Sequence, residues 1–354
     1  VLSIDRRIQY LAYRELKAAV RQHRARSGSM VVLDNRTGEV LAMVNQPAFN
    51  PNNRKNLKAN KMRNRALTDV FEPGSTMKPF VVASALESGD YRVASRIDTS
   101  PGLFQVGVHT IRDKRDYGQL DLTGVLRKSS NVGASKIALA LEPEDFWNGL
   151  SDAGFGVVTA SGFPGEAGGY LADFSRWRDI ERATLAYGYG LSVTGMQLAQ
   201  AYGVLANDGY RVPTTLLKRD TDSELERTRV FSPVVARAVR KMMESVVAAD
   251  GTAPLAAING YRVAGKTGTA HKSEAGGYAE KRYLSVFAGM APASDPRLVA
   301  VVVINEPSNG EYYGGKVAAP VFSRVMAGAL RLLNIPPDAV SLLHTQRTGT
   351  EGPA

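Results

Sequence analysis

Residues Met30–Val44 read MVVLDNRTGEVLAMV. Two β-prone apolar runs, 30–33 and 40–44, flank the turn composition Asp-Asn-Arg-Thr-Gly at 34–38, and this pattern predicts two antiparallel strands joined as a hairpin. An isolated hairpin is marginally stable in water. The rest of the chain must therefore supply further strands for a sheet.

Partner strands are predicted in the last part of the chain, where β-type runs cover 261–270, 284–290 and 298–304. Amphipathic helices are predicted at the two ends, over 8–20 and 321–333. The middle of the chain carries Ala- and Leu-rich helical patterns over 79–86, 123–141, 143–153, 182–186 and 194–207. The sequence thus predicts an α/β (α+β) fold, in which a five-stranded antiparallel sheet is flanked by helices and carries an inserted all-helical lobe.

The order of these patterns also predicts how the chain is divided. We expect residues 1–344 to form one unit, built from a sheet lobe (1–70 and 259–344) and a helical lobe (71–258), with a cleft at their junction. The charged stretches 217–229 and 271–281 are predicted as solvated loops. Residues 345–354 are predicted to form a flexible tail.

The composition excludes several classes of function. The 354 residues contain no cysteine and only four histidines, which lie far apart, so we expect no disulfide, no thiol nucleophile and no metal site. The net charge of +10 comes from scattered basic residues without a nucleic-acid-binding signature, so no nucleic-acid partner is expected. The apolar run 298–304 is far shorter than the roughly 20 residues of a spanning helix. Because the chain begins at Val1 without a signal segment, we expect an excised soluble fragment whose anchor is absent.

A first chemical motif is Ser75-Thr76-Met77-Lys78, which follows Pro73-Gly74. The preceding Pro-Gly predicts that Ser75 lies at a helix start, where backbone N–H groups and the helix dipole favour negative charge. Lys78 then lies on the same helix face, within reach of the serine hydroxyl. Burial and a second lysine would make it a base at neutral pH. Alone, a Ser-x-x-Lys motif favours the simpler interpretation of a capping serine and a surface lysine.

Two further motifs follow in the chain. Ser129-Ser130-Asn131 offers a hydroxyl for a proton relay and an amide to bind a substrate carbonyl, although a turn or a cap has the same composition. Lys266-Thr267-Gly268-Thr269 falls on a predicted strand, where Gly268 permits close approach of another backbone. A peptide could pair with this edge while Lys266, Thr267 and Thr269 meet its carboxylate, whereas the alternative is an ordinary edge strand protected by a lysine. The three motifs in this order indicate a serine acyl-transfer enzyme.

The trio resembles the motifs of penicillin-binding proteins and class A β-lactamases. Over nearly its whole length the chain resembles the transpeptidase domain of class B penicillin-binding proteins, and most of all the septal, cell-division type (the penicillin-binding protein 3 type). The stretches that carry this wider resemblance are Leu2–Asp5, Arg63–Ala66, Asp69–Gly74, Gly188–Thr194, Tyr312–Gly315 and Ala319–Phe322.

The resemblance implies a peptidoglycan D,D-transpeptidase at the periplasmic face of the bacterial inner membrane. Ser75 would attack the D-Ala-D-Ala carbonyl of a stem peptide on a lipid-linked precursor polymer, and an amine of a second stem peptide would accept the acyl group. β-Lactam antibiotics would acylate the same serine. The resemblance also implies that the parent protein works with a glycosyltransferase and other division proteins through parts that this chain lacks.

Residue roles follow from the same resemblance, which also implies that no cofactor is needed. Lys78 would be the base, Ser129 the proton relay and Asn131 a donor to the substrate amide. Lys266, Thr267 and Thr269 would hold the terminal carboxylate, and the backbone N–H groups of Ser75 and Thr269 would form the oxyanion hole. Tyr278, Tyr312 and Tyr313 are predicted either to wall the cleft or to pack in the core.

Two alternatives stay open at the level of sequence. A serine β-lactamase or D,D-carboxypeptidase needs a group that activates water, and Glu142-Pro143-Glu144 superficially resembles such an element. Its acidic residues and proline precede a helical pattern, so we expect a helix start there. The second alternative is a β-lactam sensor or division scaffold, whose serine is acylated without turnover.

Overall fold

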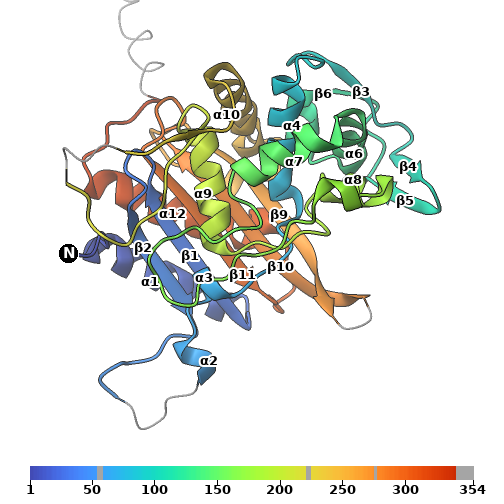
Figure 1. Cartoon of the computed structure of the whole chain (residues 1–354). Coiled ribbons are helices and arrows are strands. Elements are labelled where there is room, and N and C mark those ends of the chain that lie inside the picture. The colour runs from blue at the N-terminus through green and yellow to red at the C-terminus, as the bar shows by residue number, and fades with distance from the viewer. Residues whose placement is uncertain (54–58, 221–224, 275–276, 340–354) are drawn as a thin grey trace, which may run out of the picture.

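The computed structural model describes residues 1–53, 59–220, 225–274 and 277–339. Its centre is one five-stranded antiparallel sheet with the strand order β2-β1-β11-β10-β9 (Figure 1). The strands are β1 (Ser27–Asp34), β2 (Val40–Gln46), β9 (Ala264–Glu274), β10 (Gly277–Ala291) and β11 (Leu298–Asn305). The predicted union of the N-terminal hairpin with three C-terminal strands is confirmed. Strand β9 forms one edge of this sheet.

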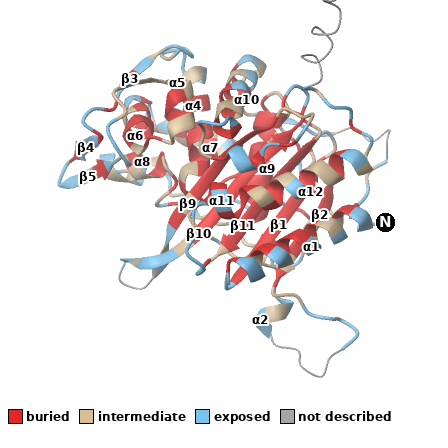
Figure 2. Cartoon of the chain, turned by 180° about the vertical axis from the view of Figure 1, so that it is seen from behind, coloured by how far each residue is buried: buried red, intermediate tan, exposed pale blue. Residues whose placement is uncertain are grey.

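Helices cover both faces of the sheet, and this explains why its inner strands are apolar on both sides. Strands β1 and β11 are buried along almost their whole length, and Val31 pairs with Val301 in their register. Helices α1 (Arg6–Gln22) and α12 (Ala319–Leu332) lie on one face and α9 (Gly195–Ala206) on the other (Figures 1 and 2). Helix α1 begins where the Asp5 side chain accepts the Arg7 N–H at 2.8 Å, an N-cap.

The remaining helices pack beside this layered core (Figure 1). Helix α4 is buried over Lys78–Ala85, and its Phe80 packs edge-on against Phe155 and Tyr202 with ring centroids 5.1 and 5.6 Å apart. One hydrophobic cluster runs from the sheet through α4 to the outer helices. These other helices are α2 (Ala59–Met62), α3 (Arg65–Thr68), α4 (Lys78–Glu87), α5 (Leu122–Lys128), α6 (Asn131–Ala140), α7 (Pro143–Asp152), α8 (Asp179–Leu185), α10 (Pro233–Val247) and α11 (Gly314–Val317), with single 3₁₀ turns at Gly74–Met77, Phe174–Arg176 and Pro254–Ala256.

The middle segment is not all-helical. Short antiparallel ribbons join β3 (Arg96–Asp98) to β6 (Gln119–Asp121), β4 (Leu103–Val106) to β5 (His109–Arg112), and β7 (Tyr210–Arg211) to β8 (Thr228–Arg229). Each strand has only two to four residues, most of them exposed or half-buried, so it is too short to show the apolar alternation that reveals a half-buried strand.

Other boundaries also differ from the prediction. The expected loop 271–281 is largely strand, because β9 and β10 continue as a ribbon beyond the sheet. The single helix expected over 123–141 is two helices, α5 and α6. The sequence patterns did not predict helix α10. Strand β8 lies inside the charged stretch 217–229, which was predicted as a loop. Residues 221–224 of that stretch and the predicted tail 345–354 lie outside the described residues. Within the described ranges, every helix is too short or too polar to cross a bilayer.

Candidate active site

Ser75 lies in a tight turn that opens a buried helix. The 3₁₀ turn Gly74–Met77 leads directly into α4, as the Pro-Gly pair predicted. Gly188, with φ at +86°, faces this turn so closely that a Cβ atom there would lie 2.0 Å from the Gly74 carbonyl oxygen. The Tyr202 hydroxyl donates to the Thr76 carbonyl at 2.9 Å. The serine is therefore held by a turn with little freedom to move.

The Lys78 amine is the centre of the site. It is fully buried, and its Nζ lies 3.0 Å from Ser75 Oγ, 3.1 Å from Ser129 Oγ, 2.6 Å from the Ser129 carbonyl and 2.7 Å from Asn131 Oδ1. Four oxygen atoms exceed the three donors of an ammonium group. An uncharged amine has two N–H donors and one lone pair, so a hydroxyl of Ser75 or Ser129 can donate to it. The sequence-predicted residues are brought together here.

Burial and neighbouring charges favour the uncharged form of both buried lysines. Burial holds the pKa of Lys78 well below its ordinary value, the charges of Lys266 and Lys114 lower it further, and Asp113 acts in the opposite direction. Burial, and then the charge of Lys114, lower the pKa of Lys266 to about 7. A neutral Lys78 beside a serine hydroxyl can act as a general base.

The second motif lies in the break between α5 and α6. Ser129 ends α5 with φ at +58°, a left-handed conformation that turns its hydroxyl toward the lysines, and Lys266 Nζ donates to that hydroxyl at 2.9 Å. Ser130 caps α6 by accepting the Gly133 N–H at 2.8 Å. The Ser129 hydroxyl thus lies between two amines that can exchange protons with it.

Asp113 holds this break in place, and the sequence reading missed it. Its carboxylate accepts the Ser130 hydroxyl and the Asn131 N–H, both at 2.5 Å, and the Val132 N–H at 3.2 Å. The Asn131 side-chain amide donates to the Arg112 carbonyl at 3.2 Å. Asp113 belongs to no motif, and only the folding of the β5–β6 loop brings it to the start of α6.

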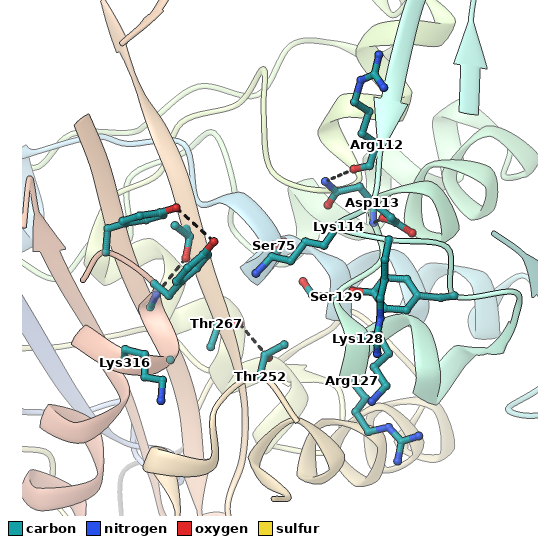
Figure 3. A pocket seen from close by; sticks show the side chains of 18 of the residues that line it. Ser75, Arg112, Asp113, Lys114, Arg127, Lys128, Ser129, Thr252, Thr267 and Lys316 are labelled. Carbon is teal, nitrogen blue, oxygen red and sulfur yellow. Dashed lines mark hydrogen bonds between the residues drawn. The ribbon is translucent and has the colours of Figure 1, made fainter. Parts of the chain in front are cut away.

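The third motif lies on the edge strand β9, next to the Ser75 turn. Gly268 passes so close to that turn that an added Cβ atom would meet the Pro73 carbonyl oxygen at 2.7 Å. The Thr267 and Thr252 hydroxyls lie 3.1 Å apart, and Thr269 Oγ1 accepts the Gly314 N–H at 3.0 Å. Lys266 is fully buried, whereas the hydroxyls of Thr267 and Thr269 line the cleft in front of Ser75. Figure 3 places Thr267 across from Ser75 and Ser129.

The three predicted tyrosines have different places. Tyr312 and Tyr313 line the cleft, which has a volume of about 730 Å³. Tyr278 is not among the residues that line it. Its ring packs edge-on against Tyr189 at 5.3 Å, and its hydroxyl donates to Glu72 Oε1 at 3.0 Å.

Glu142 does not belong to the cleft either. It occupies the N-cap position of α7, as the sequence predicted, although its side chain makes no capping hydrogen bond. The residues that line the cleft are Ser75, Arg112–Arg115, Tyr117, Arg127–Ser129, Asn131, Asp250, Thr252, Thr267, Thr269, His271, Tyr283 and Tyr312–Lys316.

The chain is similar to known proteins over most of its length. The chain is 49% identical over 340 residues to the peptidoglycan D,D-transpeptidase FtsI of Escherichia coli K12, covering 96% of this chain and 57% of that protein. It is 46% identical over 337 residues to the probable peptidoglycan D,D-transpeptidase PbpC of Pseudomonas aeruginosa, covering 95% and 59%. The chain therefore spans less than two thirds of these relatives.

A solved structure is similar over nearly the whole chain. The apo TP domain of Burkholderia pseudomallei penicillin-binding protein 3 superposes with a TM-score of 0.88 at 46% identity, covering 95% of this chain and 97% of that one. The family model "Penicillin binding protein transpeptidase domain" matches residues 28–327. By sequence, by fold and by the meeting of its three motifs, this chain belongs to the penicillin-binding protein transpeptidase family.

Proposed function

We propose that this chain is the catalytic part of a peptidoglycan D,D-transpeptidase, with Ser75 as its nucleophile. One observation carries the proposal: the buried Lys78 amine lies within hydrogen-bonding distance of both Ser75 and Ser129, next to a second buried lysine. The names of the relatives above support the reaction, although each of them is a longer protein than this chain.

The proposed acylation begins with proton transfer. Neutral Lys78 takes the hydroxyl proton as Ser75 Oγ attacks the carbonyl carbon between the two terminal D-Ala residues of a stem peptide. The resulting oxyanion accepts the backbone N–H groups of Ser75 and Thr269. When the C–N bond breaks, the departing D-Ala amine takes a proton through the Ser129 hydroxyl, and an ester on Ser75 remains.

The second half of the reaction reverses this route. The amine of an acceptor stem peptide attacks the ester carbonyl and loses a proton through Ser129 and Lys78, while Ser75 Oγ leaves and recovers its proton. The net result is one new amide bond and one free D-Ala. Lys78 ends in the uncharged form in which it began.

Strand β9 is proposed to bind the donor peptide. In the part of the chain that the structure describes, β9 is the last strand of the sheet, so an extended peptide could pair with its outer edge as an added strand. The hydroxyls of Thr267 and Thr269, with the charge of Lys266 when it is protonated, would hold the terminal carboxylate, and Gly268 keeps β9 close to the Ser75 turn. The Asn131 side chain would bind the amide of the donor.

Cellular features are proposed from the family resemblance alone. We place the protein at the periplasmic face of the bacterial inner membrane, in septal wall synthesis. Its substrates would be stem peptides on the lipid-linked polymer, and its partners a glycosyltransferase and other division proteins that bind parts outside this chain. β-Lactams would acylate Ser75 because they mimic the donor's terminal dipeptide.

A time course of the intact mass with benzylpenicillin tests the proposal. We expect a stable adduct of one penicillin per chain, mapped to Ser75 by proteolysis. The Ser75→Ala variant should give no adduct, and Ser88→Ala, at the exposed end of the same helix, should react like the wild type.

The alternatives give different results in the same experiment. Rapid loss of the adduct would indicate a serine β-lactamase or D,D-carboxypeptidase, and absence of any adduct would overturn the assignment of Ser75. A stable adduct with no cross-linking of stem-peptide polymer by the full-length protein would indicate a sensor or scaffold.

A further inference from the structure

A row of aromatic rings forms the sheet side of the cleft mouth. The His271 and Tyr283 rings are 4.7 Å apart, Tyr283 and Tyr312 are stacked at 4.0 Å, and Tyr312 and Tyr313 are 4.5 Å apart. At the end of the row, Lys114 Nζ lies 4.1 Å from the centre of the Tyr313 ring. Lys114 follows β5 on the opposite side of the cleft, so this contact spans the mouth.

Lys114 keeps a charge that is free to meet an anion. Two other cations of the cleft, Arg127 and Lys128, share the carboxylate of Asp250 at 3.2 and 3.5 Å. No carboxylate of the residues that the structure describes forms an ion pair with Lys114. The side chain is exposed, and the ring of Tyr313 attracts its ammonium group from one side only. The other side faces the cleft.

The course of β9 shows which part of a donor reaches this position. Thr267, beside Thr252, and Thr269, beside Gly314, lie two residues apart, so their side chains share one face of the strand. Tyr313 directly precedes Gly314 and therefore lies at the Thr269 end. A donor whose terminal carboxylate meets the threonines and whose scissile carbonyl meets Ser75 extends its acyl part past Thr269, toward Tyr313.

We propose that Lys114 determines specificity by binding a carboxylate on the acyl side of the donor, in front of the Tyr313 ring. This inference rests on the proposed function of the same cleft. The preferred donors are those whose acyl part carries a negative charge in addition to the terminal carboxylate. A neutral acyl part meets the same cleft without this ion pair.

Lys114 also affects the reaction in a second, unspecific way. Its charge lowers the pKa of Lys78 and of Lys266. Removal of that charge therefore changes acylation by every donor, whatever the acyl part carries. A ratio of two donors that differ only by one carboxylate cancels this general effect.

Benzylpenicillin and carbenicillin are such a pair, because carbenicillin is benzylpenicillin with a carboxylate added next to the side-chain amide. We expect the ratio of acylation rate constants, carbenicillin over benzylpenicillin, to fall about 1.5- to fivefold in Lys114→Met, the range for one solvent-exposed ion pair. Lys114→Arg should retain the ratio. In the wild type the ratio should also fall as NaCl rises from about 0.05 to 0.5 M.

Lys316→Met is the matched control. It removes one exposed charge from the same cleft, on the side of Thr267 and away from Lys114 (Figure 3), so both penicillins lose the same interaction and their ratio stays unchanged. Melting temperatures confirm that the variants are folded. An unchanged ratio in Lys114→Met, or an equal acceleration of both penicillins, would overturn the role of Lys114 alone. If neither penicillin acylates the wild type, the proposed function fails, and this inference falls with it.

Discussion

Two lysines, Lys78 and Lys266, are fully buried beside the Ser129 hydroxyl. The burial of each charged amine costs free energy that the fold has to offset. Removing an ammonium group from water is unfavourable unless it is paired, and both amines lower this cost by giving up their proton. Hydrogen bonds to Ser75, Ser129 and Asn131 satisfy Lys78, and Lys266 shares Ser129 with it. The same arrangement that lowers the cost of burial creates the base.

The first prediction concerns Lys266. Its pKa is about 7 in the folded protein and near 10.5 in an ordinary setting, so between these values the unfolded chain binds more protons and the free energy of unfolding rises with pH. Lys266→Met lacks this titration. In urea unfolding from pH 6 to 10, the free energy of unfolding of the wild type should rise relative to that of Lys266→Met by up to about 1.4 kcal/mol per pH unit within that window. Parallel curves would show that Lys266 is charged in the folded protein at pH 9.

The second prediction concerns Asp113. Asp113→Ala removes the acceptor for Ser130, Asn131 and Val132 at the start of α6, which should lower the free energy of unfolding by about 1–3 kcal/mol in urea. Because Asn131 and Ser129 then lose their placement, penicillin acylation should slow as well.

Asp116→Ala serves as the control for that variant. Asp116 belongs to the same loop, but its hydrogen bonds to Ser100 and Gly118 are exposed. Its substitution should leave the acylation rate unchanged. A normal rate in Asp113→Ala would mean that α6 keeps its start without this carboxylate.

At the level of residues, the sequence predicted the chemical groups but not their supports. Ser75, Lys78 and Lys266 were found because their residue types and local spacing already suit the chemistry. Asp113 and Lys114 could not be found in this way, because their positions depend on the fold of an irregular loop between two short ribbons. The roles of the predicted residues stay predictions until variants are measured.

At the level of elements, the sequence pattern predicts one helix where the active site needs a break between α5 and α6. The composition of 123–141 favours one continuous helix, but the chain leaves the helix at Ser129 with a positive φ. A straight helix would carry the Ser129 hydroxyl away from the lysines. The apolar periodicity continues on both sides of the break, so it gives no sign of the interruption.

The third prediction separates the backbone role of Ser129 from its hydroxyl. Glycine adopts the left-handed conformation without steric cost and alanine does not, so Ser129→Gly should be more stable than Ser129→Ala by about 1 kcal/mol in urea. Both variants lack the hydroxyl, and both should be acylated by benzylpenicillin at least about 10²-fold more slowly. Equal stability of the two variants, or a normal rate in the glycine variant, would contradict this account.

The ribbon formed by β9 and β10 beyond the sheet shows a second limit of pattern reading. Residues 271–281 are charged and contain two glycines, which is a loop composition, and yet Tyr283 pairs with His271 and Tyr278 with Ser273. Main-chain hydrogen bonds extend the ribbon once the sheet has fixed the register of the two strands. The composition of 271–281 therefore does not predict its strands, because the register of β9 and β10 is set by pairing elsewhere in the sheet.

At the level of the whole molecule, one core connects the sheet to the helical segment. Val31 of the sheet, Phe80 of α4 and Phe146 of α7 belong to a single continuous cluster of buried side chains. A second cluster is small and lies around Val106 and Ile111. The predicted sheet lobe and helical lobe therefore share their packing, and the boundaries proposed for them at 70 and 259 stay a prediction.

The fourth prediction follows from this shared core. Thermal unfolding followed by calorimetry should give one transition, with a calorimetric enthalpy equal to the van't Hoff enthalpy, because neither part can unfold without exposing the apolar surface of the other. Acylation by benzylpenicillin should raise the temperature of that one transition. Two resolved transitions, of which penicillin shifts only one, would show that the two parts unfold independently.

The pairing of β1 with β11 has a consequence during synthesis. Ser27 meets Asn305 and Asp34 meets Leu298, so the middle of the sheet cannot close until the growing chain has emerged beyond Asn305. At cellular elongation rates the nascent β1–β2 hairpin waits roughly a quarter of a minute to a minute for its partner. Throughout that interval its apolar edge along β1 is open to other chains, and chaperones that bind such segments would protect it.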